Sequence, residues 1–141
     1  EITCTSAESN RIPYLVDYES ESVFYSSDSN LATIRFDFKD KLIQPSSYKV
    51  KTAGNGKNYA HPKNWVIEVS NDGEKFIEID RHENDSTLNG PLINVKQMND
   101  NFYRFIQFRQ TGKSWHEYGN NNQIAFRFID FYGKIKLPVG K

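Results

Sequence analysis

Apolar and polar residues alternate along much of this chain, and an alternation with a period of two predicts β-strands. The clearest example is HPKNWVIEVSNDGEKFIEID, residues 61–80, where Trp65 begins an apolar face that continues at every second position. The Asn71–Gly73 segment then supplies turn residues, because glycine readily adopts the positive φ that closes a short hairpin. A return strand should carry Ile77 and Ile79 on the same apolar face. We therefore predict a β-hairpin with Trp65 in the core.

The same alternation predicts about eight short strands in the whole chain. Pro45 should interrupt one of them, because proline cannot donate a hydrogen bond to a strand ladder. In the last strand the apolar phase slips between Phe128 and Ile129, which predicts a β-bulge. Residues 9–28 are largely polar and predict a loop with one helical turn. The remaining strands are predicted at residues 2–5, 32–38, 42–43, 47–52, 92–98, 102–110 and 124–135. Many short strands without a helix pattern favour an all-β, antiparallel β-sandwich.

Length and composition fit one domain, which we place at residues 1–135, with residues 136–141 as a tail or the start of a linker. Aromatic residues make up 14% of the chain and can fill a β-rich core without disulfides. The 18 basic and 18 acidic residues give a net charge of +0, which does not favour nucleic acid as a partner. No apolar run approaches the ~18 residues of a membrane span.

Cysteine usage bears on the cellular compartment. Cys4 is the only cysteine, so no disulfide can form within the chain. This favours a cytoplasmic over an extracellular location. No signal peptide is visible, but the chain begins at Glu1 rather than Met, which suggests a piece of a larger protein.

Four phrases occur in an order that is typical of a known family: WVIEVSNDG, FIEID, YRFIQFRQTGKSW and FIDFYGKI. With them the chain resembles the F5/8 type C (discoidin-like, galactose-binding-domain-like) family. IRFDFKDKLIQPSSYKVKT is similar to a divergent branch found in protozoan proteins and beside BTB domains. The resemblance implies a jelly-roll sandwich of about eight strands. It further implies that loops at one end of the sandwich bind sugars, phospholipid headgroups or proteins, without catalysis.

Two departures from the family pattern narrow these expectations. Extracellular members often pair a cysteine near each terminus, whereas Cys4 has no partner near the C-terminus. Phospholipid-binding members carry hydrophobic spikes on basic loops, whereas the loops here are rich in asparagine. Both differences argue against a membrane role like that of clotting factors.

Two long polar loops, residues 53–63 and 111–122, hold the candidate ligand-binding residues. Sugars stack their C–H faces on aromatic rings, while amides, histidines and arginines bond to the hydroxyls. If the two loops meet at one end of the sandwich, they could form such a site. The alternatives are that Tyr59 and Trp115 cap the sandwich and that Arg109, like Arg104, serves a structural role. The candidates are Asn55, Tyr59, His61, Arg109, Trp115, His116 and Tyr118.

The sequence contains no recognisable catalytic or metal-binding motif. His61, His82 and His116 lie in separate predicted loops without HxxxH or HExxH spacing, and CxxC, Gly-x-Ser-x-Gly and phosphate-binding motifs are absent. We therefore predict no enzymatic activity and no cofactor. Many galactose-binding-like folds hold a structural calcium ion, for which loop acids would be ligands, but no calcium-loop spacing supports one here. The acids concerned are Asp17, Glu19 and Asp28.

These observations predict a non-catalytic recognition module, tethered to other domains of a larger protein. It would bind a glycan or a protein partner through its end loops. One alternative is a structural domain that packs against its neighbours and exposes an apolar patch on a sheet face. Another is a binder of phospholipid headgroups.

Overall fold

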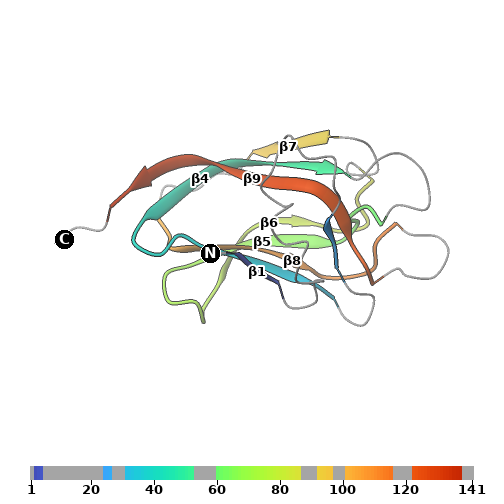
Figure 1. The fold of residues 1–141 in the computed structure, drawn as a ribbon, viewed down its shortest axis with the longest axis horizontal. Coiled ribbons are helices and arrows are strands. Elements are labelled where there is room, and N and C mark those ends of the chain that lie inside the picture. Colours follow the sequence, from blue (N-terminus) through green and yellow to red (C-terminus); the bar gives the residue numbers. More distant parts are fainter. Residues whose placement is uncertain are drawn as a thin grey trace.

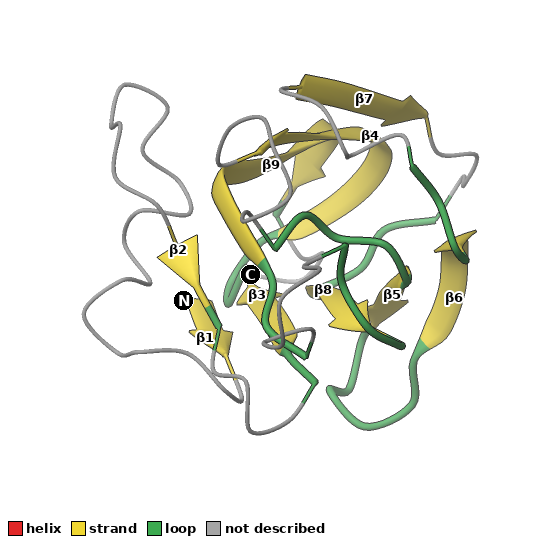
Figure 2. Ribbon diagram, turned by 90° about the vertical axis from the view of Figure 1, so that its right-hand side faces the viewer, coloured by secondary structure: helices red, strands yellow, loops and turns green. Residues whose placement is uncertain are grey.

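The computed structural model describes residues 2–4, 24–26, 31–52, 60–86, 92–96, 101–115 and 122–137. Within these residues nine strands form two packed antiparallel sheets, so the predicted all-β sandwich is confirmed (Figures 1 and 2). The five-stranded sheet runs β1 (Ile2–Cys4), β3 (Thr33–Asp37), β8 (Phe105–Gln110), β5 (Trp65–Ser70), β6 (Ile77–His82). The four-stranded sheet runs β2 (Phe24–Tyr25), β9 (Ala125–Lys136), β4 (Leu42–Thr52), β7 (Leu92–Lys96).

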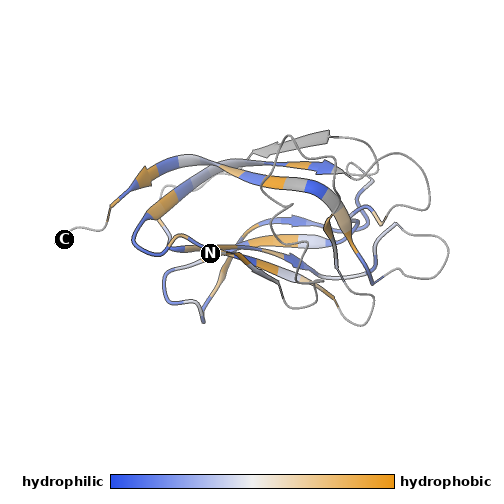
Figure 3. Cartoon of the chain, viewed as in Figure 1, coloured by the Kyte–Doolittle hydropathy of each residue, from blue (hydrophilic) through white to orange (hydrophobic). Residues whose placement is uncertain are grey.

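The core lies between the two sheets, where apolar side chains of each inner face meet. Trp65 is fully buried, and its ring stacks on Phe108 with 5.8 Å between centroids, which confirms its predicted core position. Tyr48 and Val50 of β4 are also fully buried, as their alternation predicts. Alternating apolar and polar bands along the strands show the same pattern (Figure 3). Among the described residues there is no helix long and apolar enough to cross a membrane.

Strand β5 is buried on both of its faces, although only one was predicted to be apolar. The outer face of this strand holds Val66, Glu68 and Ser70, all buried. Arg109 of the neighbouring strand covers Glu68, donating from Nε and Nη2 to the carboxylate at 2.8 and 3.2 Å. The guanidinium holds the pKa of Glu68 below its ordinary value. Central position in the sheet, together with long neighbouring side chains, explains this burial.

Strand β6 corrects the prediction for Ile77. The Asn71–Gly73 turn forms as expected, with Gly73 at φ 76°, but Ile77 is 56% exposed. A register shift opposite Ile67 and Glu68 inserts an extra residue into β6. Ile77 lies before this bulge and still pairs with the inward-facing Val69, so it is exposed because β6 is the edge strand of the sheet. Beyond the bulge the inward positions are Asp80 and His82, which the apolar pattern does not show, while Ile79 packs against the core as predicted.

Of the paired strands β4 and β9, β4 is longer than predicted, whereas β9 lies close to its predicted range. Leu42–Thr52 is one strand, because a register shift between Pro45 and Ser47 accommodates the proline. A second shift lies between Lys51 and Thr52, opposite residues 126–128, close to the predicted bulge. The prediction that residues 9–28 form only a loop was wrong at Phe24–Tyr25, which pairs with β9.

The sandwich has two distinct ends. We call the end formed by residues 60–64, 82–86 and 111–115 the loop end; it faces the viewer in Figure 2. The turn end comprises residues 38–41, 71–76 and 101–104, together with the ribbon formed by residues 42–45 and 133–137 (Figure 1).

Candidate ligand-binding site at the loop end

Backbone hydrogen bonds join two segments of the loop end. The amide of Thr111 donates to the carbonyl of Asn64 at 3.0 Å, and the amide of Trp115 donates to the carbonyl of His61 at 3.0 Å. The side chain of Asn64 adds a bond from Nδ2 to the carbonyl of Lys113. The described parts of the two predicted loops therefore lie side by side.

The segment after β6 completes this cluster. The amide of Asp85 donates to the carbonyl of Lys63 at 3.0 Å, and the amide of Asn84 donates to Oδ1 of Asn64 at 2.8 Å. Asn64 thus connects all three segments of the loop end. Loop polar groups that are bonded in this way need no ordering when a ligand arrives.

Trp115 is held in one orientation by two contacts. Its Nε1 donates to the carbonyl of Asp85 at 2.8 Å, and the Nζ of Lys63 lies 4.3 Å from the centre of its ring. The side chain is half-buried, so part of the indole meets solvent. A fixed aromatic surface with an ammonium group over the ring is suited to a polar ligand with an apolar face.

Behind Asp85, a chain of polar contacts runs into the core. Nδ1 of His82 lies 2.6 Å from a carboxylate oxygen of Asp85, and Nε2 lies 2.8 Å from one of Asp80. The same oxygen of Asp80 accepts a bond from the hydroxyl of Tyr48 at 2.7 Å. Tyr48 in turn accepts from Nε1 of Trp65 at 2.9 Å.

This arrangement favours the charged form of His82. An imidazole with a carboxylate at each nitrogen satisfies both only when both nitrogens carry protons. Hydrogen bonding to Asp80, and then to Asp85, raises the pKa of His82, while partial burial opposes the rise. The His82 ring also stacks on Trp65, with centroids 4.4 Å apart. Burial raises the pKa of the Tyr48 hydroxyl, which therefore stays protonated and donates to Asp80.

No group of three or more possible metal ligands gathers within the described ranges. Asp80 and Asp85 lie at opposite nitrogens of one imidazole and do not face a common centre. The acids considered for calcium, Asp17, Glu19 and Asp28, lie outside the described residues.

The structure places only some of the predicted site residues. His61 is fully buried and supports Trp115 through its carbonyl. Arg109 lies on the outer face of the five-stranded sheet, where its guanidinium binds Glu68. Arg104 pairs in the same way with Asp37, at 2.8 Å. Outside the described residues lie Asn55, Tyr59, His116 and Tyr118.

Several residues of the loop end were not singled out from the sequence. Lys63 and Asp85 lie in predicted polar loops, and the nearby Asp80 ends the predicted return strand of the hairpin. His82 lies in a stretch predicted as loop, but it belongs to β6. The alternation of Asp80 with His82, continuing the hairpin strand, was the signal that could have placed them on one face.

Comparison with known proteins identifies the fold. No family model matches the chain. The solved structures similar to it include CBM32-3 from a family 31 glycoside hydrolase of Clostridium perfringens, with a TM-score of 0.73, 17% identity, and coverage of 94% of this chain and 88% of that one. Another is CpGH89CBM32-5 of the same organism, in complex with GalNAc-β-1,3-galactose. Its TM-score is 0.72 at 13% identity, and the match covers 94% of each chain. The domain therefore has the galactose-binding-like jelly-roll fold of discoidin-like and family 32 carbohydrate-binding modules.

The chain is also similar to part of a protein that is named as a ubiquitin ligase rather than as a carbohydrate-binding module. The E3 ubiquitin-protein ligase Ufd4 of Drosophila melanogaster is 23% identical over 146 residues, which cover 95% of this chain. The match spans only 5% of the ligase. The similarity thus concerns one small part of a large protein.

Proposed function

We propose that this domain is a non-catalytic recognition module that binds a glycan at its loop end. The observation that carries this proposal is the oriented, half-exposed Trp115, with Lys63 over its ring, on a sandwich of the galactose-binding-like fold. Its solved neighbours include the family 32 module of Clostridium perfringens NanJ in complex with galactose, at a TM-score of 0.70 and 11% identity. Recognition of this kind needs no catalytic group, because it depends only on stacking and hydrogen bonding.

The mechanism of recognition follows from the geometry. A sugar would stack its C–H face on the exposed part of the Trp115 indole, because these two apolar surfaces exclude water from each other. The ammonium of Lys63 would donate to a ring hydroxyl. The carbonyl of Asp85 would hold the indole and the carbonyl of His61 the backbone amide of Trp115, and neither residue need contact the sugar. We retain Asn55, Tyr59, His116 and Tyr118 as further proposed contacts.

A glycan-array screen of the isolated domain tests this proposal. We expect selective binding that falls about fivefold or more in Trp115→Ala, since stacking contributes on the order of 1 kcal/mol or more. Trp115→Phe keeps a ring but removes the Nε1 donor, so it should bind more weakly than wild type and better than Trp115→Ala. Lys113→Ala, an exposed change in the same segment, is the matched control.

Near-ultraviolet circular dichroism of each variant shows whether the fold is intact. Loss of binding with an unchanged spectrum supports the site at Trp115. If Trp115→Ala unfolds the domain, the indole is a cap, as the alternative interpretation holds. A folded domain that binds no glycan, with calcium supplied, would contradict the proposal.

The second candidate function is recognition of a protein partner, which the similarity to part of a ubiquitin ligase favours. A ubiquitin-protein ligase acts on proteins, so a domain within one would meet protein partners. With this second candidate we propose a cytoplasmic location and a domain that ends near residue 135 and is tethered to a larger chain. We also propose with it the narrower resemblance to the branch found beside BTB domains. A negative glycan screen on the folded domain would favour this candidate.

A further inference from the structure

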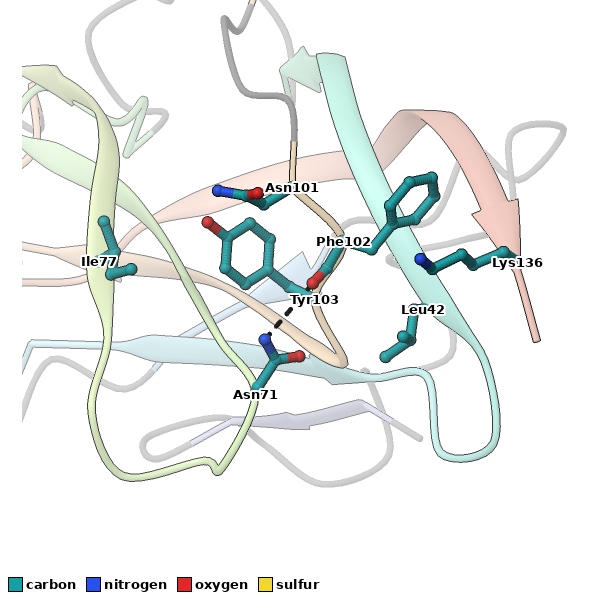
Figure 4. A pocket seen from close by; sticks show the side chains of 7 residues that line it. All are labelled: Leu42, Asn71, Ile77, Asn101, Phe102, Tyr103 and Lys136. Carbon is teal, nitrogen blue, oxygen red and sulfur yellow. Dashed lines mark hydrogen bonds between the residues drawn. The ribbon is translucent and has the colours of Figure 1, made fainter. Parts of the chain in front are cut away.

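A groove opens at the turn end, far from the candidate glycan site. It lies between the β5–β6 hairpin and the ribbon of β4 and β9, with residues 101–103 between them (Figure 4). Its volume is about 770 Å³. The residues that line it include Leu42, Asn71, Ile77, Phe102, Tyr103 and Lys136.

The floor of the groove is rigid. Tyr103 is buried, and its amide and carbonyl both bond to the backbone of Ile43 at 2.8 Å. Nδ2 of Asn71 donates to the carbonyl of Phe102 at 3.4 Å, and its Oδ1 accepts from the amide of Arg104 at 3.2 Å. These bonds connect the hairpin turn to residues 101–104. The shape therefore exists before any partner binds, which lowers the entropy lost on binding.

The walls of the groove leave apolar surface in contact with water. Ile77 is 56% exposed on the hairpin side. Leu42 and Phe102 are half-buried on the ribbon side, so part of each remains open. An apolar side chain placed between them would remove all three surfaces from solvent, and burial of such surface is the main source of affinity in peptide grooves.

Positive charge lies beside this apolar surface. Nζ of Lys136 lies 4.3 Å from the centre of the Phe102 ring. Lys134 precedes it by two residues and so shares its face of the ribbon. Both are exposed, and within the described ranges neither forms an ion pair. Carboxylates of a partner could therefore bind these two ammonium groups.

We propose that this groove docks an extended acidic peptide segment of a partner protein. One apolar side chain inserts between Ile77 and Phe102 above Tyr103, and flanking carboxylates bind Lys134 and Lys136. The inference goes beyond the proposed glycan site and uses the opposite end of the sandwich. The recognised chemistry is an apolar anchor flanked by Asp or Glu.

The surface around the groove favours a peptide over an anionic membrane. Ile135 and Leu137 are exposed, but they alternate with Lys136 and so lie on the other face of the ribbon. A flat bilayer cannot meet both faces at once.

A titration with the peptide acetyl-Asp-Glu-Leu-Asp-Glu-amide, followed by ¹⁵N chemical shifts of the domain, tests this inference. We expect saturable shifts at the amides of Ile77, Phe102 and Tyr103. The variant Lys134→Glu/Lys136→Glu and the variant Ile77→Asp should each bind at least about tenfold more weakly, because one reverses the charge and the other removes the apolar wall. These side chains are exposed, so the fold should persist. Lys113→Glu, with one such charge reversal at the loop end, should bind like wild type.

Two further peptides distinguish the contribution of the apolar anchor to binding from that of the acidic residues. Replacing Leu by Ser should abolish binding, and a peptide with Lys and Arg in place of the acids should not bind. Equal affinity for either peptide, no shifts, or shifts confined to the loop end would overturn the inference.

Two other occupants of the groove would also overturn it. Binding to phosphatidylserine vesicles that Lys134→Glu/Lys136→Glu abolishes would indicate a lipid. A dimer in sedimentation that Ile77→Asp dissociates would indicate a second copy of the domain.

Discussion

At the scale of single residues, Trp65 connects the core to the loop end. It is fully buried, stacks on His82 and Phe108, and bonds through Nε1 to the hydroxyl of Tyr48. Its one polar atom is therefore satisfied inside the core. Sequence alternation identified the burial of Trp65, but the partner of its Nε1 depends on a strand of the other sheet.

The first prediction concerns this core position. Trp65→Ala should lower the free energy of unfolding by about 3–5 kcal/mol, because a large cavity would replace a well-packed ring. Tyr48→Phe should cost about 1–3 kcal/mol, since it leaves Nε1 of Trp65 without its acceptor. Urea denaturation measures both values. An unfolding free energy for Trp65→Ala within 1 kcal/mol of wild type would contradict the packing.

The second prediction concerns pH. The pKa of His82 is raised in the folded state above its unfolded value of about 6.5. Its contribution to stability is therefore complete below about pH 6.5 and is lost as the pH rises through the folded pKa. The free energy of unfolding should fall over that interval, with a slope of at most about 1.4 kcal/mol per pH unit for one proton.

Unfolding in urea at a series of pH values measures this slope. His82→Phe keeps an aromatic ring over Trp65 but cannot titrate, and so serves as the control. The contribution of His82 is the difference between the two profiles. Parallel profiles for wild type and variant would show that the imidazole does not hold Asp80 and Asp85 as a charged group.

At the scale of elements, the ribbon of β4 and β9 depends on a single glycine. A Cβ atom on Gly133 would lie 1.9 Å from the carbonyl oxygen of Gln44, which is backbone and cannot move aside alone. Gly133 pairs with Pro45, next to the register shift before Ser47. The absence of a side chain allows the two strands to approach here.

Gly133→Ala should therefore lower the free energy of unfolding by at least about 1–3 kcal/mol, the usual cost of forcing an extra carbon into a packed site. Lys134→Ala is the matched control, since that side chain is exposed and its loss should change stability by less than about 0.5 kcal/mol. Thermal unfolding of both variants provides the comparison. Equal melting temperatures would show that the strands separate at Gly133 without cost.

At the scale of the whole molecule, the two ends of the sandwich offer different chemistry. The loop end presents an oriented indole with an ammonium group over its ring, whereas the turn end presents a partly apolar groove with Lys136 in its lining. The rigid double sheet separates them, so each proposed ligand can be tested while the other site stays intact. The outer face of the five-stranded sheet is polar, with Arg109 and Arg104 in ion pairs. Its described residues form no apolar patch of the kind expected of a packing domain.

The sequence by itself determined the fold class, most strands, the hairpin turn and the core position of Trp65. These features depend on side-chain alternation and turn residues, which are local properties of the chain. Only the tertiary structure decided that Asp80 and His82 face inward, that Ile77 is exposed, and that Lys63 and Asp85 hold Trp115. The reason is physical: a bulge changes which side chains share a face, an edge position in the sheet leaves a side chain uncovered, and the register between distant strands determines which loops meet.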